Sequence, residues 1–241
     1  MRPDALQLLL PFPHAARYDS RDFVPAASNR GALAWLDTDW PDRRLAVWGP
    51  AGCGKTHLLH VWAERAEVRI MTGHGLRTLD EVPHGGGLAL DDADAVPSEP
   101  LLLHLLNTAR DRGLSVLLSG QTPPSRWPIR LPDLSSRLRA IAAVGIDAPS
   151  DDLLAALLVS LLSGRQMHVP QTVQDWLLTR LPRSPAILRR AVERLDRISL
   201  ETGRPVTRPL AARVLAEAGL LHTVDDDVLD AAPFFQAPGF L

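Results

Sequence analysis

The sequence predicts an α/β fold: a parallel five-stranded sheet with helices on both faces, followed by a small all-helical lid domain. Up to about residue 149, short apolar runs alternate with segments of helical spacing, as in a parallel sheet covered on both faces. From Ser150 onward only helical patterns occur. A glycine-rich turn stands between the first expected strand and the next helix, at the sheet edge where parallel α/β proteins bind ligands.

These patterns divide the chain into four parts: a tail at 1–17, the α/β domain at 18–149, the helical domain at 150–220 and a second tail at 221–241. Apolar runs predict strands at Arg44–Trp48, Val68–Met71, Leu88–Leu90, Leu114–Leu118 and Ile141–Val144. Helical spacing and cap residues predict helices at Ser98–Arg112, Asp151–Leu162, Gln171–Leu181, Pro185–Leu200 and Pro209–Ala218. Ser150 and Ser184 are the expected N-cap residues of two of these helices.

Composition limits the class of protein. The chain has 241 residues, 46 % of them hydrophobic, and a formal net charge of −2, which argues against a nucleic-acid footprint over the whole surface. The single cysteine, Cys53, cannot form an internal disulfide and is best read as a small filler residue. Without an apolar run of bilayer length or a signal-type N-terminus, we expect a soluble, cytoplasmic protein with no membrane partner.

The glycine-rich turn has the form G-x-x-x-x-G-K-[ST], a phosphate-binding loop. Glycines let backbone N–H groups converge on phosphate oxygens, and the following helix adds its positive N-terminal end. Lys55 is the only lysine in the chain and would reach the β- and γ-phosphates, while the Thr56 hydroxyl would ligate Mg²⁺. The alternative is a chance glycine-rich turn. The expected nucleotide-binding residues of the loop are Gly49, Pro50, Ala51, Gly52, Cys53, Gly54, Lys55 and Thr56.

Two further strands bring polar side chains to the same sheet edge. Asp91 ends the third strand and would hold Mg²⁺, and Asp92 is placed to polarise an attacking water. A solvated acidic loop is the alternative reading of this pair. Ser119 and Gln121 follow the fourth strand and could sense the γ-phosphate or the water, unless they are an ordinary polar strand end.

Arg137 follows a polar helical turn a short distance beyond the fourth strand. An arginine placed in this way is suited to act in trans, on the nucleotide of a neighbouring subunit. In an arginine-rich chain, a plain surface arginine is the alternative.

Together, the phosphate loop, the Asp91-Asp92 strand end, Leu134–Leu138 and the helical lid resemble the AAA+ ATPases. Asp22-Phe23-Val24, Ser28-Asn29 and Gly54–Leu58 resemble DnaA more closely, over roughly Tyr18 to Gly219. The resemblance implies an adenine nucleotide, ADP or ATP with Mg²⁺, and extends the nucleotide-binding set to Phe23, Val24, Asn29 and His57. DnaA's N-terminal and double-stranded-DNA-binding domains have no counterpart, so the chain is similar to the Hda group of DnaA-related regulators, which promote hydrolysis of DnaA-bound ATP.

The N-terminal tail resembles a peptide that binds the sliding clamp, the β subunit of DNA polymerase III, and would bring the protein to DNA indirectly. In such a peptide the glutamine enters a polar pocket, while leucine and an aromatic residue fill an apolar one. The alternative is a tail that packs on its own core. The residues that carry this resemblance are Gln7, Leu8, Leu10, Pro11 and Phe12.

Three departures from the family bear on activity. Ala186 stands where the third lid helix usually carries a sensor arginine, which leaves Arg183, Arg189 or Arg190 as substitutes. Gln121 stands where aspartate is common, and the stretch between the phosphate loop and Asp91 is shorter than in DnaA. These three departures argue against an efficient ATPase. They favour a nucleotide-bound adaptor whose Arg137 acts on the nucleotide of DnaA.

Two other functions fit the motifs. One is a DnaC-like helicase loader that grips single-stranded DNA as an ATP-driven homo-oligomer, against which the near-neutral charge argues. The other is a metabolic P-loop kinase, for whose acceptor substrate the helical lid offers no signature.

Overall fold

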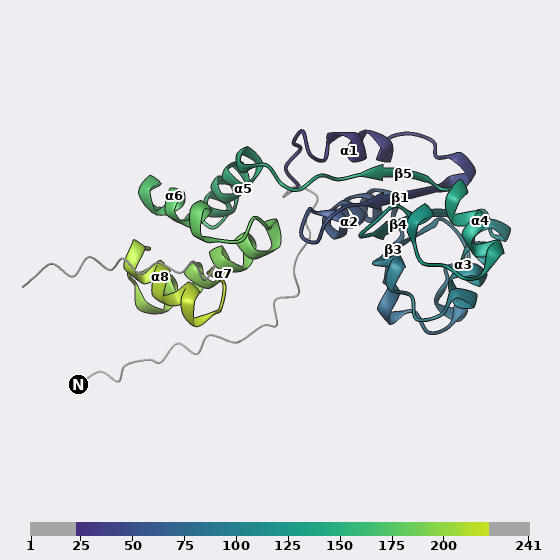
Figure 1. The fold of residues 1–241 in the computed structure, drawn as a ribbon. Coiled ribbons are helices and arrows are strands. Elements are labelled where there is room, and N and C mark those ends of the chain that lie inside the picture. Colours follow the sequence, from purple (N-terminus) through teal and green to yellow (C-terminus); the bar gives the residue numbers. More distant parts are fainter. Residues whose placement is uncertain (1–22, 222–241) are drawn as a thin grey trace, which may run out of the picture.

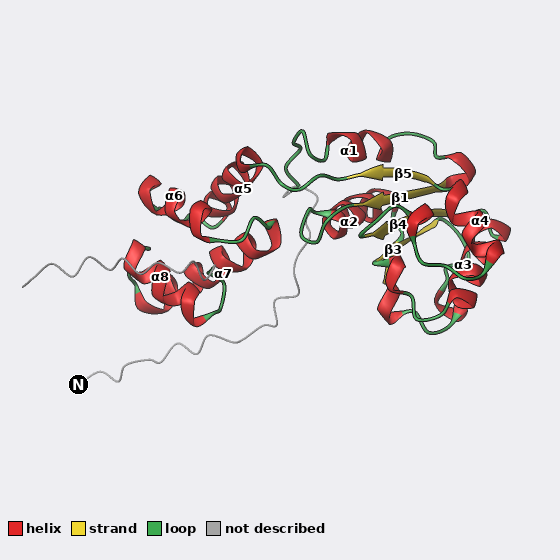
Figure 2. Ribbon diagram, viewed as in Figure 1, coloured by secondary structure: helices red, strands yellow, loops and turns green. Residues whose placement is uncertain are grey.

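The computed structural model describes residues 23–221, and it confirms the predicted fold class. All neighbouring strands run parallel, in the order β2-β3-β4-β1-β5, so their carboxyl ends meet at one edge of the sheet (Figures 1 and 2). The strands are β1 (Arg44–Trp48), β2 (Arg69–Thr72), β3 (Gly87–Asp91), β4 (Ser115–Gly120) and β5 (Ala142–Gly145).

Helices cover both faces of the sheet. The helices of this domain are α1 (Arg30–Leu36), α2 (Lys55–Ala66), α3 (Glu99–Asp111) and α4 (Pro132–Ala140). Short 3₁₀ turns occur at Pro41–Arg43, Gly73–Gly75, Leu79–Glu81, Ala93–Ala95 and Pro124–Arg126. One buried cluster joins α1 and α2 to the sheet, and a second joins α3 and α4 to the other face.

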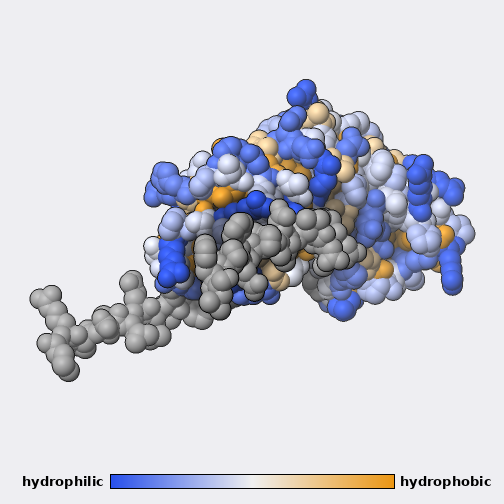
Figure 3. Space-filling model, turned by 60° about the vertical axis from the view of Figure 1, so that its left-hand side comes forward, coloured by the Kyte–Doolittle hydropathy of each residue, from blue (hydrophilic) through white to orange (hydrophobic). Residues whose placement is uncertain are grey.

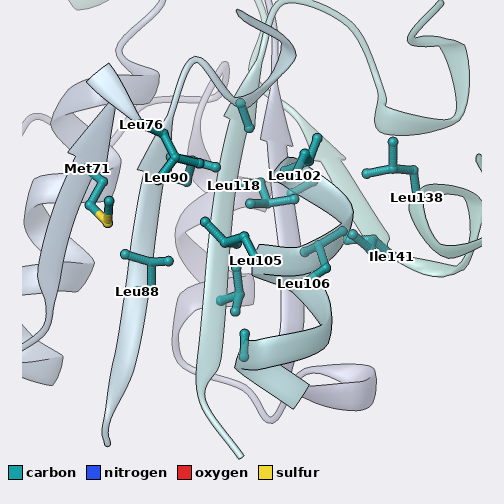
Figure 4. Packing of buried hydrophobic residues seen from close by; sticks show 14 of the residues in the cluster. Met71, Leu76, Leu88, Leu90, Leu102, Leu105, Leu106, Leu118, Leu138 and Ile141 are labelled. Carbon is teal, nitrogen blue, oxygen red and sulfur yellow. The ribbon is translucent and has the colours of Figure 1, made fainter. Parts of the chain in front are cut away.

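Leucines dominate the core under α3. Leu102, Leu105 and Leu106 belong to one buried cluster with side chains of β3 and β4 such as Leu88 and Leu118 (Figure 4). Their i, i+3, i+4 spacing places all three on one face of the helix. This face holds α3 against the strands whose ends carry the candidate site.

Residues 151–217 contain the helices of the lid, α5 (Asp151–Gly164), α6 (Gln171–Arg180), α7 (Pro185–Thr202) and α8 (Arg208–Glu217), which share a separate apolar core. Ser150 caps α5 as predicted, because its Oγ accepts a hydrogen bond from the Leu153 N–H at 3.2 Å. Ser184 occupies the N-cap position of α7, but its side chain makes no capping hydrogen bond.

Three strands begin one residue later than the apolar runs predict. In each case the first apolar residue ends the preceding helix instead. The N–H groups of Val68, Leu114 and Ile141 donate to the carbonyls of Ala63, Ala109 and Leu138, respectively. An apolar residue just past a helix end is common in such capping turns, and periodicity alone does not separate it from a strand.

The surface of the described residues is mixed in hydropathy. In the space-filling view, hydrophobic residues outside the grey atoms form small areas among hydrophilic ones (Figure 3). From Phe23 to Leu221, no helix has the length and apolar character needed to cross a membrane. The predicted clamp-binding segment and the C-terminal tail lie outside the described residues.

We expect Leu105→Ala to lower the free energy of unfolding by about 2–5 kcal/mol, because the side chain is fully buried under the sheet and leaves a cavity. The control is Leu200→Ala, the same chemical change at a side chain on α7 that is 72 % exposed, with an expected effect within about 0.5 kcal/mol. Urea titration of both variants measures the difference. Equal losses would contradict the burial assigned to α3.

Candidate nucleotide-binding site

The phosphate loop connects β1 to α2 and is closely packed. A Cβ at Gly49 would collide with the carbonyl oxygen of Ile146, and one at Gly52 would lie 2.6 Å from the Ser184 Oγ of the lid. Gly52 also has φ +76°, in the left-handed region that glycine adopts at low cost. The backbone of Ile146 therefore leaves no room for a side chain at Gly49, and the left-handed backbone favours glycine at Gly52.

Lys55 lies at the first position of α2 with its side chain folded over the loop. It is 7 % exposed, and its Nζ donates to the carbonyl oxygens of Gly49 at 2.8 Å and Pro50 at 3.0 Å. Gly54 is the N-cap and supplies no side chain to the first N–H groups of α2. The loop thus places an ammonium beside the first N–H groups of a helix, which is an anion-binding arrangement.

Asp91 joins three elements at the carboxyl edge of the sheet. Its Oδ2 accepts a hydrogen bond from the Thr56 Oγ1 of α2 at 2.8 Å, and its Oδ1 accepts one from the Ser119 Oγ of β4 at 2.5 Å. The first pair brings a hydroxyl and a carboxylate together, and hard oxygen ligands of this kind suit Mg²⁺. Ser119 is fully buried, so its hydroxyl positions the carboxylate instead of facing the loop.

Asp92 follows β3 with φ +50°, and its N–H donates to the Ser119 Oγ at 2.8 Å. Partial burial raises the pKa of the Asp92 carboxyl, and the negative charges of Asp91 and Asp94 raise it further. A carboxylate with a raised pKa accepts a proton from water more readily.

The structure also shows how Gln121 is held. Gln121 is exposed, and its N–H donates to the Asp94 Oδ2 at 2.8 Å. Sequence reasoning missed Asp94, although the Asp91-Asp92-x-Asp94 spacing after a buried strand was a signal for it. This contact fixes the turn after β4 to the turn after β3.

The segment that precedes α1 contacts both domains. Phe23 packs against the core cluster that includes α2, whereas Val24 packs against the lid cluster. The buried Asn29 organises this segment: its Oδ1 accepts from the Ala26 N–H at 2.8 Å and its Nδ2 donates to the Val24 carbonyl at 3.0 Å.

The lid reaches the phosphate-loop helix through α7. Arg189 Nη2 lies 3.0 Å from the Nδ1 of His57, and the His57 ring packs edge-on against Phe23 with 5.1 Å between centroids. Ala186 and Arg190 are exposed, and Arg183 pairs with Asp151. Of the three arginines considered as substitutes at Ala186, Arg189 is therefore the one brought to the site.

Arg137 lies far from the chain's own phosphate loop. It projects from α4, is 22 % exposed and pairs with Asp133 at 3.1 Å. It is close enough to Arg44, the first residue of β1, for the two charges to interact. The loop follows the other end of β1, and a strand of five residues spans roughly 16 Å.

The parallel sheet, the phosphate loop between β1 and α2 and the helical lid define the AAA+ fold. Residues 151–215 match the family model described as the lid domain of Hda. The chain therefore has the fold of the DnaA AAA+ domain, and its lid segment is similar to the lid domain of Hda.

Similar proteins cover both domains. Domain III of the replication initiation protein DnaA from Thermotoga maritima aligns with a TM-score of 0.67 and 20 % identity, over 83 % of this chain and 96 % of that one. AMPPCP-bound DnaA from Aquifex aeolicus aligns with a TM-score of 0.63 and 16 % identity, over 84 % and 69 % of the two chains. A curated Haemophilus influenzae protein, described as uncharacterized, is 27 % identical over 184 residues, 70 % of this chain and 80 % of its own.

Cys53 offers a test of the loop's packing. Burial raises the pKa of its thiol, and the thiolate is the form that reacts. We expect iodoacetamide to label the native chain several-fold more slowly than the urea-unfolded chain at neutral pH, with the native rate rising only at higher pH. Mass spectrometry measures the adduct and Cys53→Ala supplies the blank. Equal rates in native and unfolded chains would contradict the buried loop.

Proposed function

We propose that this protein is a DnaA-related regulator of replication that binds an adenine nucleotide and the DNA-loaded sliding clamp. It stimulates hydrolysis of the ATP bound to DnaA, and so acts negatively on initiation. The position of Arg137 carries this proposal, together with the Hda-type lid.

The first step is nucleotide binding. Backbone N–H groups of 49–56 and the Lys55 ammonium would hold the phosphates of ADP or ATP, in place of the hydrogen bonds that Lys55 makes to loop carbonyls. Thr56 and Asp91 would hold Mg²⁺, which neutralises phosphate charge when bound. The segment containing Phe23, Val24 and Asn29, together with His57, would surround the base and ribose.

The lid would register the bound nucleotide through α7. Arg189 is a permanent cation beside the loop helix, and a phosphate group would compete with His57 for it. Asp92, with its raised pKa, is the residue suited to activate water, and Gln121 is held nearby on the Asp94 turn. The chain's own turnover is secondary to its action on DnaA.

The second step is the contribution in trans. Arg137 is separated from its own loop by the length of β1, so its guanidinium is available to a nucleotide on the next AAA+ subunit. The exposed pair with Asp133 is weak and is readily exchanged for a phosphate. A composite site forms in this way, with DnaA supplying the nucleotide and this chain supplying the arginine.

We expect Arg137→Ala to leave nucleotide affinity unchanged and to lower stimulated hydrolysis of DnaA-bound ATP by about 10³-fold or more, the typical contribution of a trans-acting arginine. Phosphate release from DnaA–ATP is measured with clamp-loaded DNA. Arg139→Ala is the matched control, because Arg139 is an exposed arginine on the same helix. Full stimulation by Arg137→Ala would exclude this arginine from the composite site.

The proposed clamp-binding role of the N-terminal tail is tested separately. We expect Gln7→Ala combined with Leu10→Ala to abolish retention of the protein on immobilised clamp, because a polar and an apolar anchor are lost together. Leu9→Ala is the control, since Leu9 is not among the proposed anchors. Stimulation should then also cease to depend on clamp-loaded DNA. Undiminished retention of the double variant would remove the tail from the proposal.

A further inference from the structure

The near-neutral charge of the whole chain conceals an uneven distribution. Residues 151–221 carry ten arginines against seven aspartates and glutamates, whereas residues 222–241 carry four aspartates and no arginine or lysine. The lid is therefore positively charged, although the formal net charge of the chain is −2. A basic face on one domain is typical of a protein that binds a polyanion.

Three arginines form a row on α7. Arg190, Arg194 and Arg197 are all exposed, and their i, i+4, i+7 spacing places them on one face of the helix. At a rise of about 1.5 Å per residue, the first and the last lie about 10 Å apart along the helix axis. Leu188 and Leu195 belong to the lid core and lie on the other side of α7, so this arginine row faces solvent.

The acids in the middle of the same helix are already neutralised. Arg165, just after α5, lies 3.4 Å from the Glu193 carboxylate and 3.8 Å from the Asp196 carboxylate. The remaining acid of α7, Glu201, is exposed four residues after Arg197, at the end of the arginine row. Within residues 23–221, none of the three arginines of the row forms an ion pair. The row therefore presents three cations with a single acid at one end.

The segment before α1 connects the lid to the proposed clamp-binding motif. Val24 packs against the core of the lid. Phe12, the last residue of the motif, precedes Phe23 by eleven residues, a length that spans at most about 40 Å. A clamp held by this motif is therefore held close to the lid, together with the DNA on which it is loaded.

We infer that the arginine row of α7 binds the phosphate backbone of the duplex DNA on which the clamp is loaded. This inference rests on the proposed function and gives the lid a ligand of its own. A duplex carries one phosphate charge per about 1.7 Å of its axis, so a row about 10 Å long faces several phosphates at once. Guanidinium groups suit them, because each planar fork bonds two phosphate oxygens.

The contact is independent of sequence and weak by itself. Contacts to the backbone carry no base information, and non-specific binding of this kind has a Kd of about 10⁻⁴–10⁻⁶ M at physiological salt. Attachment to the clamp through the N-terminal tail raises the effective concentration of DNA at the lid to about the mM range. The tail and the arginine row thus act together, and the lid is oriented on the DNA beside the clamp.

Fluorescence anisotropy of a labelled duplex of about 20 base pairs, with the full-length protein and without clamp or DnaA, measures this contact. Three phosphate contacts predict binding about 40-fold weaker at about 200 mM than at about 50 mM salt. We expect Arg194→Gln to lower the salt slope of the affinity by about 1, and the triple change of Arg190, Arg194 and Arg197 to glutamine to remove the salt-dependent binding. Glu201→Gln should tighten binding several-fold, because it removes the acid at the end of the row.

The matched control replaces Arg65, Arg126 and Arg139, three exposed arginines of the α/β domain, by glutamine. This variant loses the same charge, so equal weakening in both triple variants would reduce the effect to net charge and overturn the inference. Tighter binding of a single strand than of the duplex would also overturn it. All six positions are exposed, so thermal melting should show both variants folded, with Tm close to wild type.

The DnaA–ATP assay separates this inference from the proposed function. With clamp-loaded DNA, the triple variant of the arginine row should need about tenfold more protein for half-maximal stimulation but reach the same maximal rate, because Arg137 is unchanged. If the wild type stimulates DnaA and this variant matches it in both stimulation and duplex binding, the arginine row is wrong and the proposed function stands. If the wild type binds the duplex through the row but never stimulates DnaA, the proposed function fails and the contact to DNA stands.

Discussion

The carboxylate of Asp91 is the contact on which the nucleotide-binding edge depends. It accepts hydroxyl hydrogen bonds from Thr56 on α2 and from Ser119 on β4, and so ties the loop helix to two central strands. Ser119 is fully enclosed and its oxygen also accepts the Asp92 N–H, so one hydroxyl fixes both acidic residues. Hydrogen bonds to a charged group in such a low-dielectric place are strong, and they hold the carboxylate in one orientation.

The two ends of the parallel strands carry different residues. The carboxyl ends carry the phosphate loop, Asp91 and Asp92, and the amino end of β1 carries Arg44 beside Arg137. A single subunit cannot bring these two ends together, because β1 is a rigid spacer between them. In the proposed function, a second AAA+ subunit brings its nucleotide to the arginine at the amino end of this sheet.

Periodicity and motif spacing were enough to predict the fold, the helical lid and the location of the phosphate loop, because these depend on local patterns. They misplaced the starts of three strands, since Val68, Leu114 and Ile141 close helix ends through bonds that the pattern does not encode. They also could not show that Ser119 faces Asp91, which depends on how β4 lies beside β3. The burial of Arg44, which is 7 % exposed, was not predicted either, because arginine is rarely buried without an ionic partner.

The lid brings Arg189, and not the residue at position 186, to the phosphate-loop helix. Residues three apart share a face of a helix, so Arg189 lies one turn further along α7 on the side of Ala186. The start of the same helix places Ser184 against Gly52, and Arg189 meets His57 in the first turn of α2. Because α7 is a single rigid element held by its own core of Leu188, Ala191, Val192 and Leu195, the two contacts cannot move independently. In the proposed function, a displacement of the phosphate loop would reach the lid through these two contacts, and Arg189 would act one turn further along α7 than position 186.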